Sequence, residues 1–342
     1  MKKSDFSYHL PQRLIAQTPA SPRDASRLLC LRRGSEEMHH HHFFDLPTLL
    51  QPGDLLVLNN TKVLPARLLG RKEGMQRSCE LLLLQERETD VWECLAKPGK
   101  RIRPGDTLLF GGGVLQAYIL ETLPNGGKLV RFSHRGGTLY EVLDTLGEMP
   151  LPPYIESRQS RPEDYQTVYA KQRGSAAAPT AGLHFTQDLF ARLRDAGITT
   201  AELTLHVGLG TFRPVQEEEV ENHPMHSEWY EIGEQAAEAI RRTKRQGGRV
   251  IAVGTTSCRT LEAVAAQYGE IRAASGETDI FITPGHTFKA IDGLLTNFHL
   301  PESTLLMLVS AFYGRENTLR AYSVAIEQQY RFYSFGDAML IL

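Results

Sequence analysis

The sequence has few cysteines, no excess of charge and no long apolar run, and each of these absences excludes a class of protein. Its four cysteines form no CxxC pair, which argues against a disulfide framework or a zinc ribbon and favours reduced cytosolic thiols. Lys and Arg total 38 against 40 Asp and Glu, so no overall basic field attracts nucleic acid. The longest apolar stretch, Leu305–Phe312, is too short to span a membrane, and the first residues lack the apolar run of a signal peptide. We therefore expect a cytoplasmic protein without a membrane segment.

Several signatures of nucleotide-binding and metal-dependent enzymes are also missing. No Gly-Lys-Ser/Thr step occurs, which excludes a Walker phosphate loop. The GLG step at 208–210 is followed by Arg213 and Pro214 rather than by a helix, which excludes a Rossmann fingerprint. No HExxH pattern is present either. The chain of 342 residues is 41% hydrophobic and 23% charged, so it can bury a sizeable core and is neither collagen-like nor wholly disordered.

The sequence from Val63 to about Glu148 has the pattern of a small β domain. Short apolar runs such as SCELLLLQE and GKLVRFS are separated by Pro-Gly, Gly-Gly-Gly and Asn-Gly-Gly turns, with no helical period. This spacing is typical of a β-barrel or a β-sandwich. A proline-rich segment, MPLPPYI, follows and predicts a return linker. We therefore assign residues 63–148 to an inserted β-barrel domain.

The flanking residues, 1–62 and 149–342, predict a discontinuous α/β main domain. An apolar strand at Asp54–Leu58 breaks at Asn59, and helices and strands alternate after Tyr165. The predicted helices span 186–196, 233–246, 256 onward, 303–313 and 318–329, and the predicted strands span 198–207, 249–254, 279–283 and 293–296. Such alternation favours a mixed sheet with helices on its faces, so the fold class is α/β with an inserted β-barrel.

Two loops carry histidines among small residues. The loop AAAPTAGLHF contains Thr180 and His184 directly before a predicted helix. Small residues let the backbone approach a ligand, and the helix N-terminus favours an anion, although a tight turn with a core histidine is equally consistent. The loop LTLHVGLGTF places His206 at the end of a strand, before Gly208 and Gly210. Ligands of open α/β sheets gather at such ends, which suits His206 to acid–base chemistry.

The segment NHPMHSEWYEI raises the question of a metal site. His223, His226 and Glu228 are types of residue that bind zinc, but the HxxH spacing lacks structured third and fourth ligands. Hydrogen bonding in a cleft is therefore the favoured interpretation.

Hydroxyl and carboxamide groups mark two further strand ends. The segment VIAVGTTSCRTLE predicts that Thr255–Ser257 cap a helix and hold a carboxylate or phosphate there, with ordinary capping as the simpler alternative. In TNFHLPEST, the polar Asn297, His299 and Glu302 lie in apolar sequence, which indicates either a hydrogen-bond network or a site. Glu302 suits the first turn of the helix that follows. The run His39–His42 is expected to be a solvated loop.

Local basic clusters are the feature that could contact nucleic acid. Two lie near or within the insert, where they could meet phosphates, although solvated faces explain them equally well. A third, at Arg241–Arg245, lies at a helix C-terminus, where the helix dipole already accounts for cations. The members of the first two clusters are Arg67, Arg71, Lys72, Lys97, Lys100, Arg101 and Arg103.

Taken together, these segments resemble one family. LLVLNNTKVLPARLLGRK, AAPTAGLHFT, LTLHVGLGTFRPV, MHSEWYEI, LLTNFHLPESTLL and YRFYSFGDAMLI stand in the order found in the queuosine-pathway S-adenosylmethionine:tRNA ribosyltransferase-isomerases. The match runs over nearly the whole chain. Two departures, the histidine run and the end at Leu342, touch none of the motifs.

The resemblance implies an unusual use of S-adenosylmethionine as a co-substrate, without a metal. Its ribosyl group is transferred to 7-aminomethyl-7-deazaguanine at the wobble position of tRNA and isomerised, which gives epoxyqueuosine, adenine and methionine. The family has a β-barrel inserted in an α/β domain, as deduced above. We expect the chain to act as a monomer on tRNA that carries this precursor.

The proton transfers of such a reaction suit histidine, whose pKa lies near neutrality. The matching motifs therefore suggest four catalytic candidates: His184, His206, His226 and His299. The candidates for binding S-adenosylmethionine are Thr180, Gly208, Gly210, Thr255, Thr256, Ser257, Asn297 and Glu302. Among these, the Thr255–Ser257 turn is expected to hold the methionine carboxylate, and Asn297 and Glu302 the ribose hydroxyls or the amine.

Three other functions remain to be distinguished by experiment. An RNA methyltransferase would release S-adenosylhomocysteine, but the glycine-rich loop and acidic strand end of a Rossmann methyltransferase are missing. A non-catalytic RNA-binding module would bind tRNA without consuming a co-substrate. A metal hydrolase built on His206, His223 and His226 would lose activity with a chelator.

Overall fold

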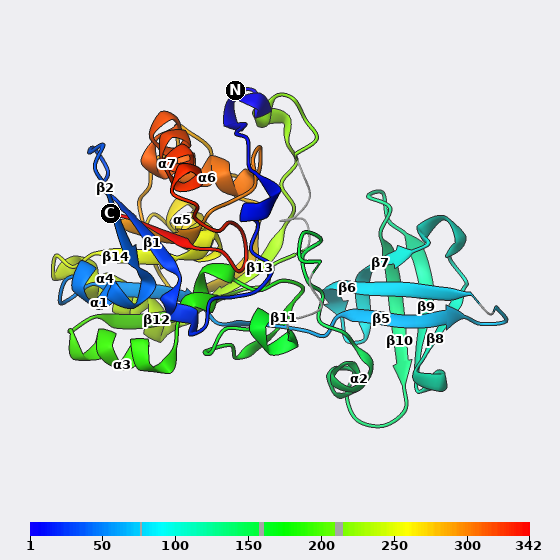
Figure 1. The fold of residues 1–342 in the computed structure, drawn as a ribbon. Coiled ribbons are helices and arrows are strands. Elements are labelled where there is room, and N and C mark those ends of the chain that lie inside the picture. Colours follow the sequence, from blue (N-terminus) through cyan, green and yellow to red (C-terminus); the bar gives the residue numbers. More distant parts are fainter. Residues whose placement is uncertain (76, 157–160, 209–214) are drawn as a thin grey trace. The chain divides into compact units, whose positions relative to one another are not determined.

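A computed structural model describes residues 1–75, 77–156, 161–208 and 215–342. By its contacts the chain divides into two compact units (Figure 1). The first contains Met1–Asn60, Pro153–Lys171 and Pro179–Leu342, and the second contains Thr61–Pro152 and Gln172–Ala178. The fold predicted from the sequence, a mixed α/β unit interrupted by a β-barrel, is confirmed. The contacts also assign the segment Gln172–Ala178, which lies outside the predicted 63–148 insert, to the second unit.

A nine-stranded mixed sheet forms the centre of the first unit. Its strands, in spatial order, are β15 (Ala274–Thr278), β13 (Glu228–Ile232), β12 (Thr199–Leu205), β3 (Leu55–Asn59), β14 (Val250–Val253), β16 (Gly293–Asn297), β17 (Ala338–Ile341), β1 (Arg27–Leu31) and β2 (Met38–His42). The four strands β12, β3, β14 and β16 run parallel to one another. All five residues of β3 are buried, as expected for a parallel strand covered on both faces.

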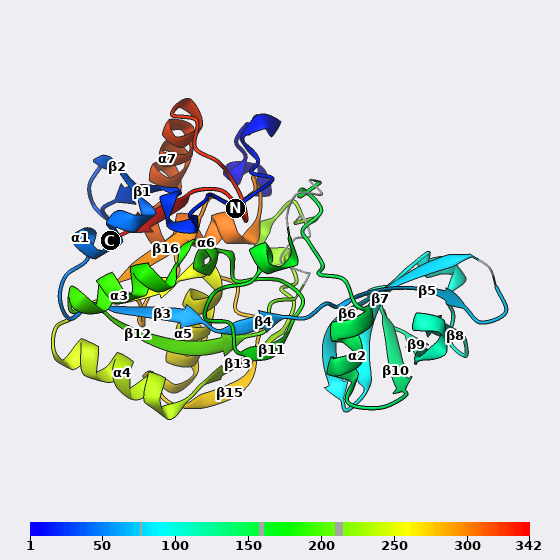
Figure 2. The same ribbon diagram turned by 60° about the horizontal axis from the view of Figure 1, so that its bottom comes forward.

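Helices cover this sheet (Figures 1 and 2). They are α1 (Leu46–Leu49), α3 (Gln187–Asp195), α4 (Glu234–Arg245), α5 (Gly254–Tyr268), α6 (Thr304–Tyr313) and α7 (Arg315–Glu327). Thr186, the first residue of the predicted 186–196 helix, caps α3, because its hydroxyl accepts the amide of Leu189. Ser303 caps α6 in the same way through the amide of Leu306. The helices bury an apolar core against the sheet, with Phe185, Leu189 and Leu193 among its members.

A closed six-stranded barrel forms the second unit. Its strands follow the order β10 (Lys128–His134), β7 (Val91–Lys97), β6 (Ser78–Glu88), β5 (Arg67–Lys72), β8 (Thr107–Phe110) and β9 (Leu115–Thr122). Helix α2 (Leu139–Leu146) packs on this barrel, and β4 (Thr61–Val63) pairs with β11 (Gln172–Ser175). The barrel closes tightly at Gly70, where a Cβ atom would lie 2.4 Å from the carbonyl oxygen of Leu109. Its interior is filled by apolar side chains that include Trp92, Phe110 and Leu115.

Two of the predicted elements are wrong, and side chains explain both. No strand forms at 279–283, because the Thr278 hydroxyl accepts the amide of Ile280 and the Ile280 carbonyl accepts the Arg259 guanidinium. The run His39–His42 is mostly exposed, as expected, but it forms edge strand β2 rather than a loop and pairs antiparallel with β1. The ring of His40 also bonds to the hydroxyl of Tyr330 at 2.7 Å.

Helix starts differ from the prediction as well. Helix α5 spans Gly254–Tyr268 rather than starting near Thr256, and its first residue, Gly254, has a left-handed backbone with φ 86°, which glycine adopts without strain. Helix α7 begins at Arg315 rather than Thr318, directly after Gly314 with φ 91°. Every helix in the described ranges is too short or too polar to cross a bilayer.

Candidate active site

The candidate residues of the first unit collect at one edge of the sheet. The parallel strands β12, β3, β14 and β16 are neighbours, so their carboxyl ends lie side by side. Directly after these ends come His206, Asn60, Gly254 and the Asn297–His299 segment. Ligands of open α/β sheets bind outside the carboxyl ends of the strands. The topology therefore brings together motifs that are separated by up to 239 residues in the sequence, from Asn60 to His299.

His184 is buried and hydrogen-bonded through both ring nitrogens. Asn297 donates its Nδ2 to the Nε2 of His184 at 3.2 Å, which assigns the ring proton to Nδ1. That Nδ1 lies 2.7 Å from the Oγ of Ser26 and donates to it. Burial, with the nearby charges of Arg331 and Arg23, lowers the pKa of His184 to about 3. The ring is therefore neutral at pH 7, and it fixes the orientation of Asn297.

The strand end after β16 holds two further candidates. His299 is buried, its Nε2 lies 2.8 Å from the Oγ1 of Thr296, and burial lowers its pKa to about 3. Glu302 does not belong to the first turn of α6 as predicted, because Ser303 is the cap and Glu302 precedes it. Its backbone adopts a left-handed conformation with φ 59°, and its amide donates to the carbonyl of Phe6. A strained non-glycine backbone of this kind is frequent at functional sites.

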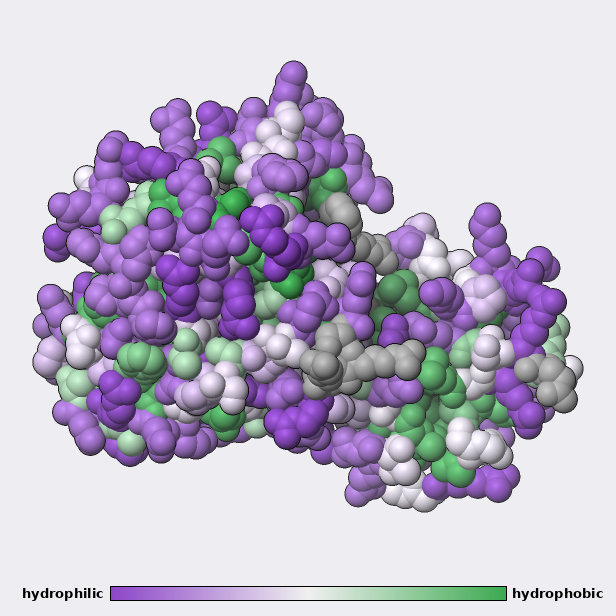
Figure 3. Space-filling model, in the orientation of Figure 1, coloured by the Kyte–Doolittle hydropathy of each residue, from purple (hydrophilic) through white to green (hydrophobic). Residues whose placement is uncertain are grey.

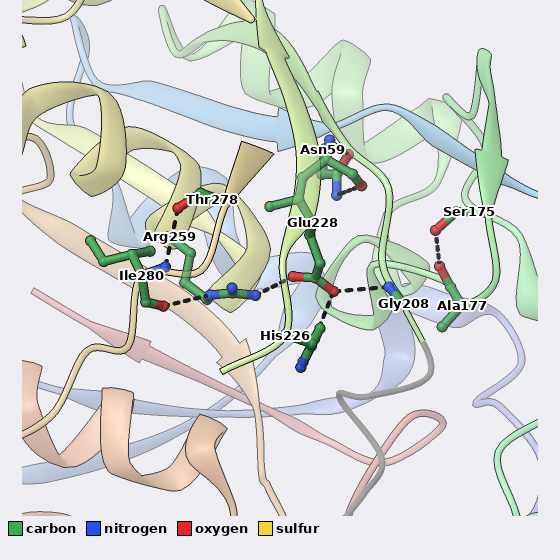
Figure 4. Close-up of polar contacts among 10 residues, drawn as sticks. Asn59, Ser175, Ala177, Gly208, His226, Glu228, Arg259, Thr278 and Ile280 are labelled. Atoms are coloured by element: carbon green, nitrogen blue, oxygen red, sulfur yellow. Dashed lines mark hydrogen bonds and ion pairs between the residues drawn. The ribbon is translucent and has the colours of Figure 1, made fainter. Parts of the chain in front are cut away.

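Glu228 on β13 lies at the centre of a buried polar cluster (Figure 4). Its carboxylate forms an ion pair with Nη1 of Arg259, which is on α5. The same carboxylate accepts the amide of Gly208 at 2.8 Å and lies 3.1 Å from Nε2 of His226. One side chain thus ties β13, α5 and the segment after β12 together.

The neighbours of Glu228 keep its carboxyl group ionised. Burial by itself would raise the pKa of this carboxyl, but the Arg259 charge, the hydrogen bond of His226 and the Gly208 amide lower the pKa to about 2. The group is therefore a permanent anion at neutral pH. A fixed carboxylate beside an imidazole stabilises the imidazolium that forms when the ring accepts a proton, and His226, only partly exposed at 28%, is the ring so placed.

His206 follows β12 and stacks on Trp229. The ring centroids are 5.0 Å apart, and the His206 amide donates to the carbonyl of Trp229 at 2.9 Å. Burial lowers the pKa of His206 to about 4, so the ring is neutral at pH 7. Gly208 lies two residues further on, whereas Gly210 lies outside the described residues.

The predicted capping of α5 by its hydroxyl residues is wrong. Val253 occupies the cap position, and no side chain caps the helix. Thr255, Thr256 and Ser257 instead lie inside the first turn, where all three are buried. The hydroxyls of Thr256 and Ser257 have no hydrogen-bond partner among the described residues. Thr180 begins the short 3-10 helix Thr180–His184 and is half-buried.

In the described ranges, no group of three or more His, Cys, Asp and Glu side chains is arranged to hold a metal ion. His223 does not join His226 and Glu228, because its ring packs against Phe281 at 5.5 Å instead.

Comparison with known proteins assigns the family. Residues 3–341 match the family described as queuosine biosynthesis protein. The chain belongs to the queuosine biosynthesis protein family. Over all 342 residues of both chains, it is 59% identical to the S-adenosylmethionine:tRNA ribosyltransferase-isomerase of Desulfitobacterium hafniense and 56% identical to that of a Thermoanaerobacter species. The resemblance found in the sequence is thereby confirmed.

A solved structure of the family has the same fold. The crystal structure of S-adenosylmethionine tRNA ribosyltransferase from Thermotoga maritima is 38% identical, with a TM-score of 0.58. The match covers 99% of this chain and 100% of that chain. The queuosine biosynthesis family therefore accounts for both units of the chain.

One important site residue was missed in the sequence. Arg259 lies in the middle of an ordinary helical stretch, where a single arginine carries no signal. Its partner Glu228 is 31 residues earlier and was considered only as a metal ligand. The sequence signal that could have found the pair is the apolar surroundings of Arg259, which follows Cys258 and lies two residues before Leu261 in a helix that is buried on most sides.

The basic candidates of the second unit fall into two groups. Arg67 and Lys72 lie beside carboxylates, with Arg67 3.4 Å from Glu80 and Lys72 2.7 Å from Asp106. The remaining five are exposed and form no ion pair within the described part of the chain: Arg71, Lys97, Lys100, Arg101 and Arg103. Figure 3 shows hydrophilic residues over much of the visible surface, with smaller apolar areas between them.

Proposed function

We propose that this chain is an S-adenosylmethionine:tRNA ribosyltransferase-isomerase. It transfers the ribosyl group of S-adenosylmethionine to 7-aminomethyl-7-deazaguanine in tRNA and isomerises it, which gives epoxyqueuosine-tRNA, adenine and methionine. The observation that carries this proposal is 59% identity, over the full length of both chains, to a relative of that name. The polar cluster at the strand ends agrees with it, because the reaction needs several proton transfers in one site.

We assign different tasks to the four histidines. His184 and His299 are buried and neutral, and their ring nitrogens bond to Asn297 and Thr296, which suits positioning rather than proton exchange. His206 and His226 are the candidates for proton transfer. His226 has the Glu228 carboxylate to stabilise its protonated form, and His206 lies at the strand end where a substrate would bind.

Polar groups at the same edge are candidates for binding S-adenosylmethionine. Asn297 directs its Nδ2 to His184, and its Oδ1 is buried without a partner in the described chain, so this oxygen can accept a ribose hydroxyl. Glu302, five residues after Asn297, has a strained backbone, and its carboxylate can accept a hydrogen bond from a hydroxyl or the amine. The first turn of α5, with Thr255, Thr256 and Ser257, suits the methionine carboxylate, while Thr180 and Gly208 would allow the backbone to approach the ligand closely.

The exposed cations of the barrel unit are candidates for contacts with tRNA phosphates. Each phosphate contact contributes about 0.7–0.9 to the slope of log Kd against log salt. We therefore expect Arg101→Glu or Lys97→Glu to weaken tRNA binding and to reduce this slope by about that amount. Arg135→Glu, at an exposed arginine of the same unit outside the cluster, is the matched control. Unchanged affinity and slope in the cluster variants would refute the contact.

One incubation tests the proposed activity. Purified protein is mixed with S-adenosylmethionine and tRNA that carries the deazaguanine precursor, and mass spectrometry follows the nucleosides and the small products. Adenine, methionine and an epoxyqueuosine nucleoside would establish the ribosyl transfer. S-adenosylhomocysteine with a methylated base would show a methyltransferase instead, and tRNA binding without turnover would show a binding module. Loss of turnover on addition of a chelator would identify a metal-dependent enzyme.

A further inference from the structure

We propose that Arg259 recognises the carboxylate of the methionine part of S-adenosylmethionine, and that Glu228 is the positioning residue that holds Arg259 for this purpose. The inference rests on the proposed function and adds to it the residue that selects a carboxylate-bearing substrate.

The first observation is an unsatisfied charge. Arg259 is only 4% exposed, and a guanidinium carries five N–H donors. Its Nη1 pairs with Glu228, and its Nε donates to the carbonyl of Ile280 at 3.2 Å. Its Nη2 is buried and has no acceptor among the described residues. A buried charged donor without an acceptor is costly, and an oxygen supplied by a ligand would remove that cost.

The second observation is the place of this arginine on its helix. Helical side chains point back toward the N-terminus, and residues three apart share a face, so Arg259 extends over the turn that holds Thr256. The first turn of the 15-residue helix α5 has free backbone amides and no side-chain cap. The hydroxyl of Thr256, which is 9% exposed, also lacks a partner in the described chain. Three kinds of donor thus face the same helix end, where the dipole favours an anion.

The charges at this end favour a carboxylate over a phosphate. Glu228 already offsets the unit charge of Arg259, so the remaining positive potential is mainly the roughly half charge of the helix end. A single negative charge fits this potential better than the two of a phosphate monoester. Of the guanidinium nitrogens only Nη2 lacks an acceptor, so Arg259 would donate to one carboxylate oxygen and leave the other to the Thr256 hydroxyl and the amides of the helix end.

Glu228 links this recognition to the candidate for proton transfer. The carboxylate that holds Nη1 of Arg259 also accepts the Gly208 amide and lies 3.1 Å from Nε2 of His226. A carboxylate bound by Arg259 therefore fixes the methionine end of the substrate at a known place relative to His226. The buried carboxylate of Glu228 thus contacts both the arginine that would bind the substrate and the histidine that would transfer a proton.

The test compares two ligands on three proteins. Isothermal titration measures the binding of S-adenosylmethionine and of its decarboxylated analogue to the parent chain, to Arg259→Lys and to Arg249→Lys. We expect the parent to prefer S-adenosylmethionine by about 10- to 100-fold, the range for a charged hydrogen-bonded pair. In Arg259→Lys this ratio falls toward one, through weaker binding of S-adenosylmethionine alone. Arg249→Lys is the matched control, because Arg249 pairs with Asp54 at the opposite end of β14, and it keeps the ratio.

Every other result counts against the proposal in a recognisable way. Equal weakening of both ligands in Arg259→Lys would mean that Arg259 only supports the fold, and a parent that does not distinguish the ligands would rule out carboxylate recognition. Unchanged discrimination with weaker tRNA binding would assign Arg259 to a phosphate instead. If the parent binds neither ligand even when tRNA that carries the precursor is present, the proposed function itself fails. Should Arg259→Lys not fold, Thr256→Val keeps the arginine and removes one donor, and it must then reduce the preference by several-fold.

Discussion

The buried pair of Glu228 and Arg259 allows one prediction to be worked out in full. Replacement of Glu228 by glutamine removes the negative charge but keeps the shape of the side chain. The guanidinium of Arg259, 4% exposed, is then left as an uncompensated buried charge. We expect the Glu228→Gln variant to remain folded but to lose a large part of the stability of the first unit.

Two independent routes give the magnitude. The neighbours of Glu228 lower its pKa from 4.5 to about 2, and a shift of about 2.5 units corresponds to about 3 kcal/mol. Breaking a buried ion pair by removal of one partner costs about 3–5 kcal/mol in general. The free energy of unfolding should therefore fall by about 3 kcal/mol at pH 7.

Urea unfolding with a local reporter measures this loss. Trp229 adjoins Glu228 on β13, and the other tryptophan, Trp92, is in the barrel, so a Trp92→Phe background restricts the fluorescence signal to the first unit. With a urea slope of about 3 kcal/mol per molar, the midpoint should move by about 1 M. The double variant Glu228→Gln/Arg259→Met removes both charges and should recover much of the loss, because an apolar replacement of the whole pair is often nearly neutral.

The pH dependence has a definite sign. Because the pKa of Glu228 is lower in the folded state, its contribution is complete above about pH 4.5 and is lost as the pH falls toward 2. The stability gap between the parent and Glu228→Gln should thus be constant from pH 7 to 5 and narrow below that. A gap smaller than about 1 kcal/mol at pH 7, or a double variant as unstable as the single one, would refute this account.

Three further predictions concern the surroundings of the site. The buried carboxylate of Glu262 accepts the amides of Lys289, Ala290 and Ile291 at 3.0, 2.9 and 3.2 Å. The Glu262→Gln variant should therefore lower the free energy of unfolding by about 2 kcal/mol, and the amides of 289–291 should exchange with solvent faster. Unchanged hydrogen exchange at these amides would contradict this prediction. Gly182→Ala should strongly lower the urea midpoint of unfolding, because the new Cβ atom would lie 2.0 Å from the Tyr169 hydroxyl. The control Gly233→Ala, where a Cβ atom would have no neighbour within 4 Å, should reduce the free energy of unfolding by less than about 1 kcal/mol. Folding lowers the pKa of His184 and of His299 from 6.5 to about 3, so acidification below about pH 6.5 should destabilise the first unit. Each histidine should lower the free energy of unfolding by about 1.4 kcal/mol per pH unit. Urea midpoints between pH 7 and 5 measure this loss, and an unchanged midpoint would show that these rings titrate normally.

The sequence predicted the parts of this molecule that depend on local pattern. The short apolar runs between glycine turns indicated the barrel, and the strand–helix alternation after Tyr165 indicated the mixed sheet. The Thr186 cap could be predicted because a hydroxyl residue preceded an amphipathic run. Histidines next to strand ends were recognised as candidates, since chain topology places such ends on one edge.

What the sequence could not predict depends on distant partners. The left-handed conformation of Gly254 at the start of α5 is one such feature, because the sequence around it does not reveal a positive φ. The segment 279–283 was apolar enough for a strand, but the guanidinium of Arg259, on α5, donates a hydrogen bond to the carbonyl of Ile280. The pairing of Arg259 with Glu228 joins a helix to a strand 31 residues away, and nothing in the local sequence shows that these two side chains meet.

Features that reduce stability also lie at this edge of the sheet. In the described chain, Glu302 and Tyr333 are two of four non-glycine residues with positive φ, and the carbonyl of Tyr333 accepts the side chain of Asn297. Unpartnered buried atoms also occur here, on Asn297, Thr256 and Arg259. Strained backbone and unsatisfied polar groups each reduce stability, and a fold shaped by stability alone would lose them. Those that lie after β14 and β16, where parallel strands end, are what a site preorganised for a polar substrate requires.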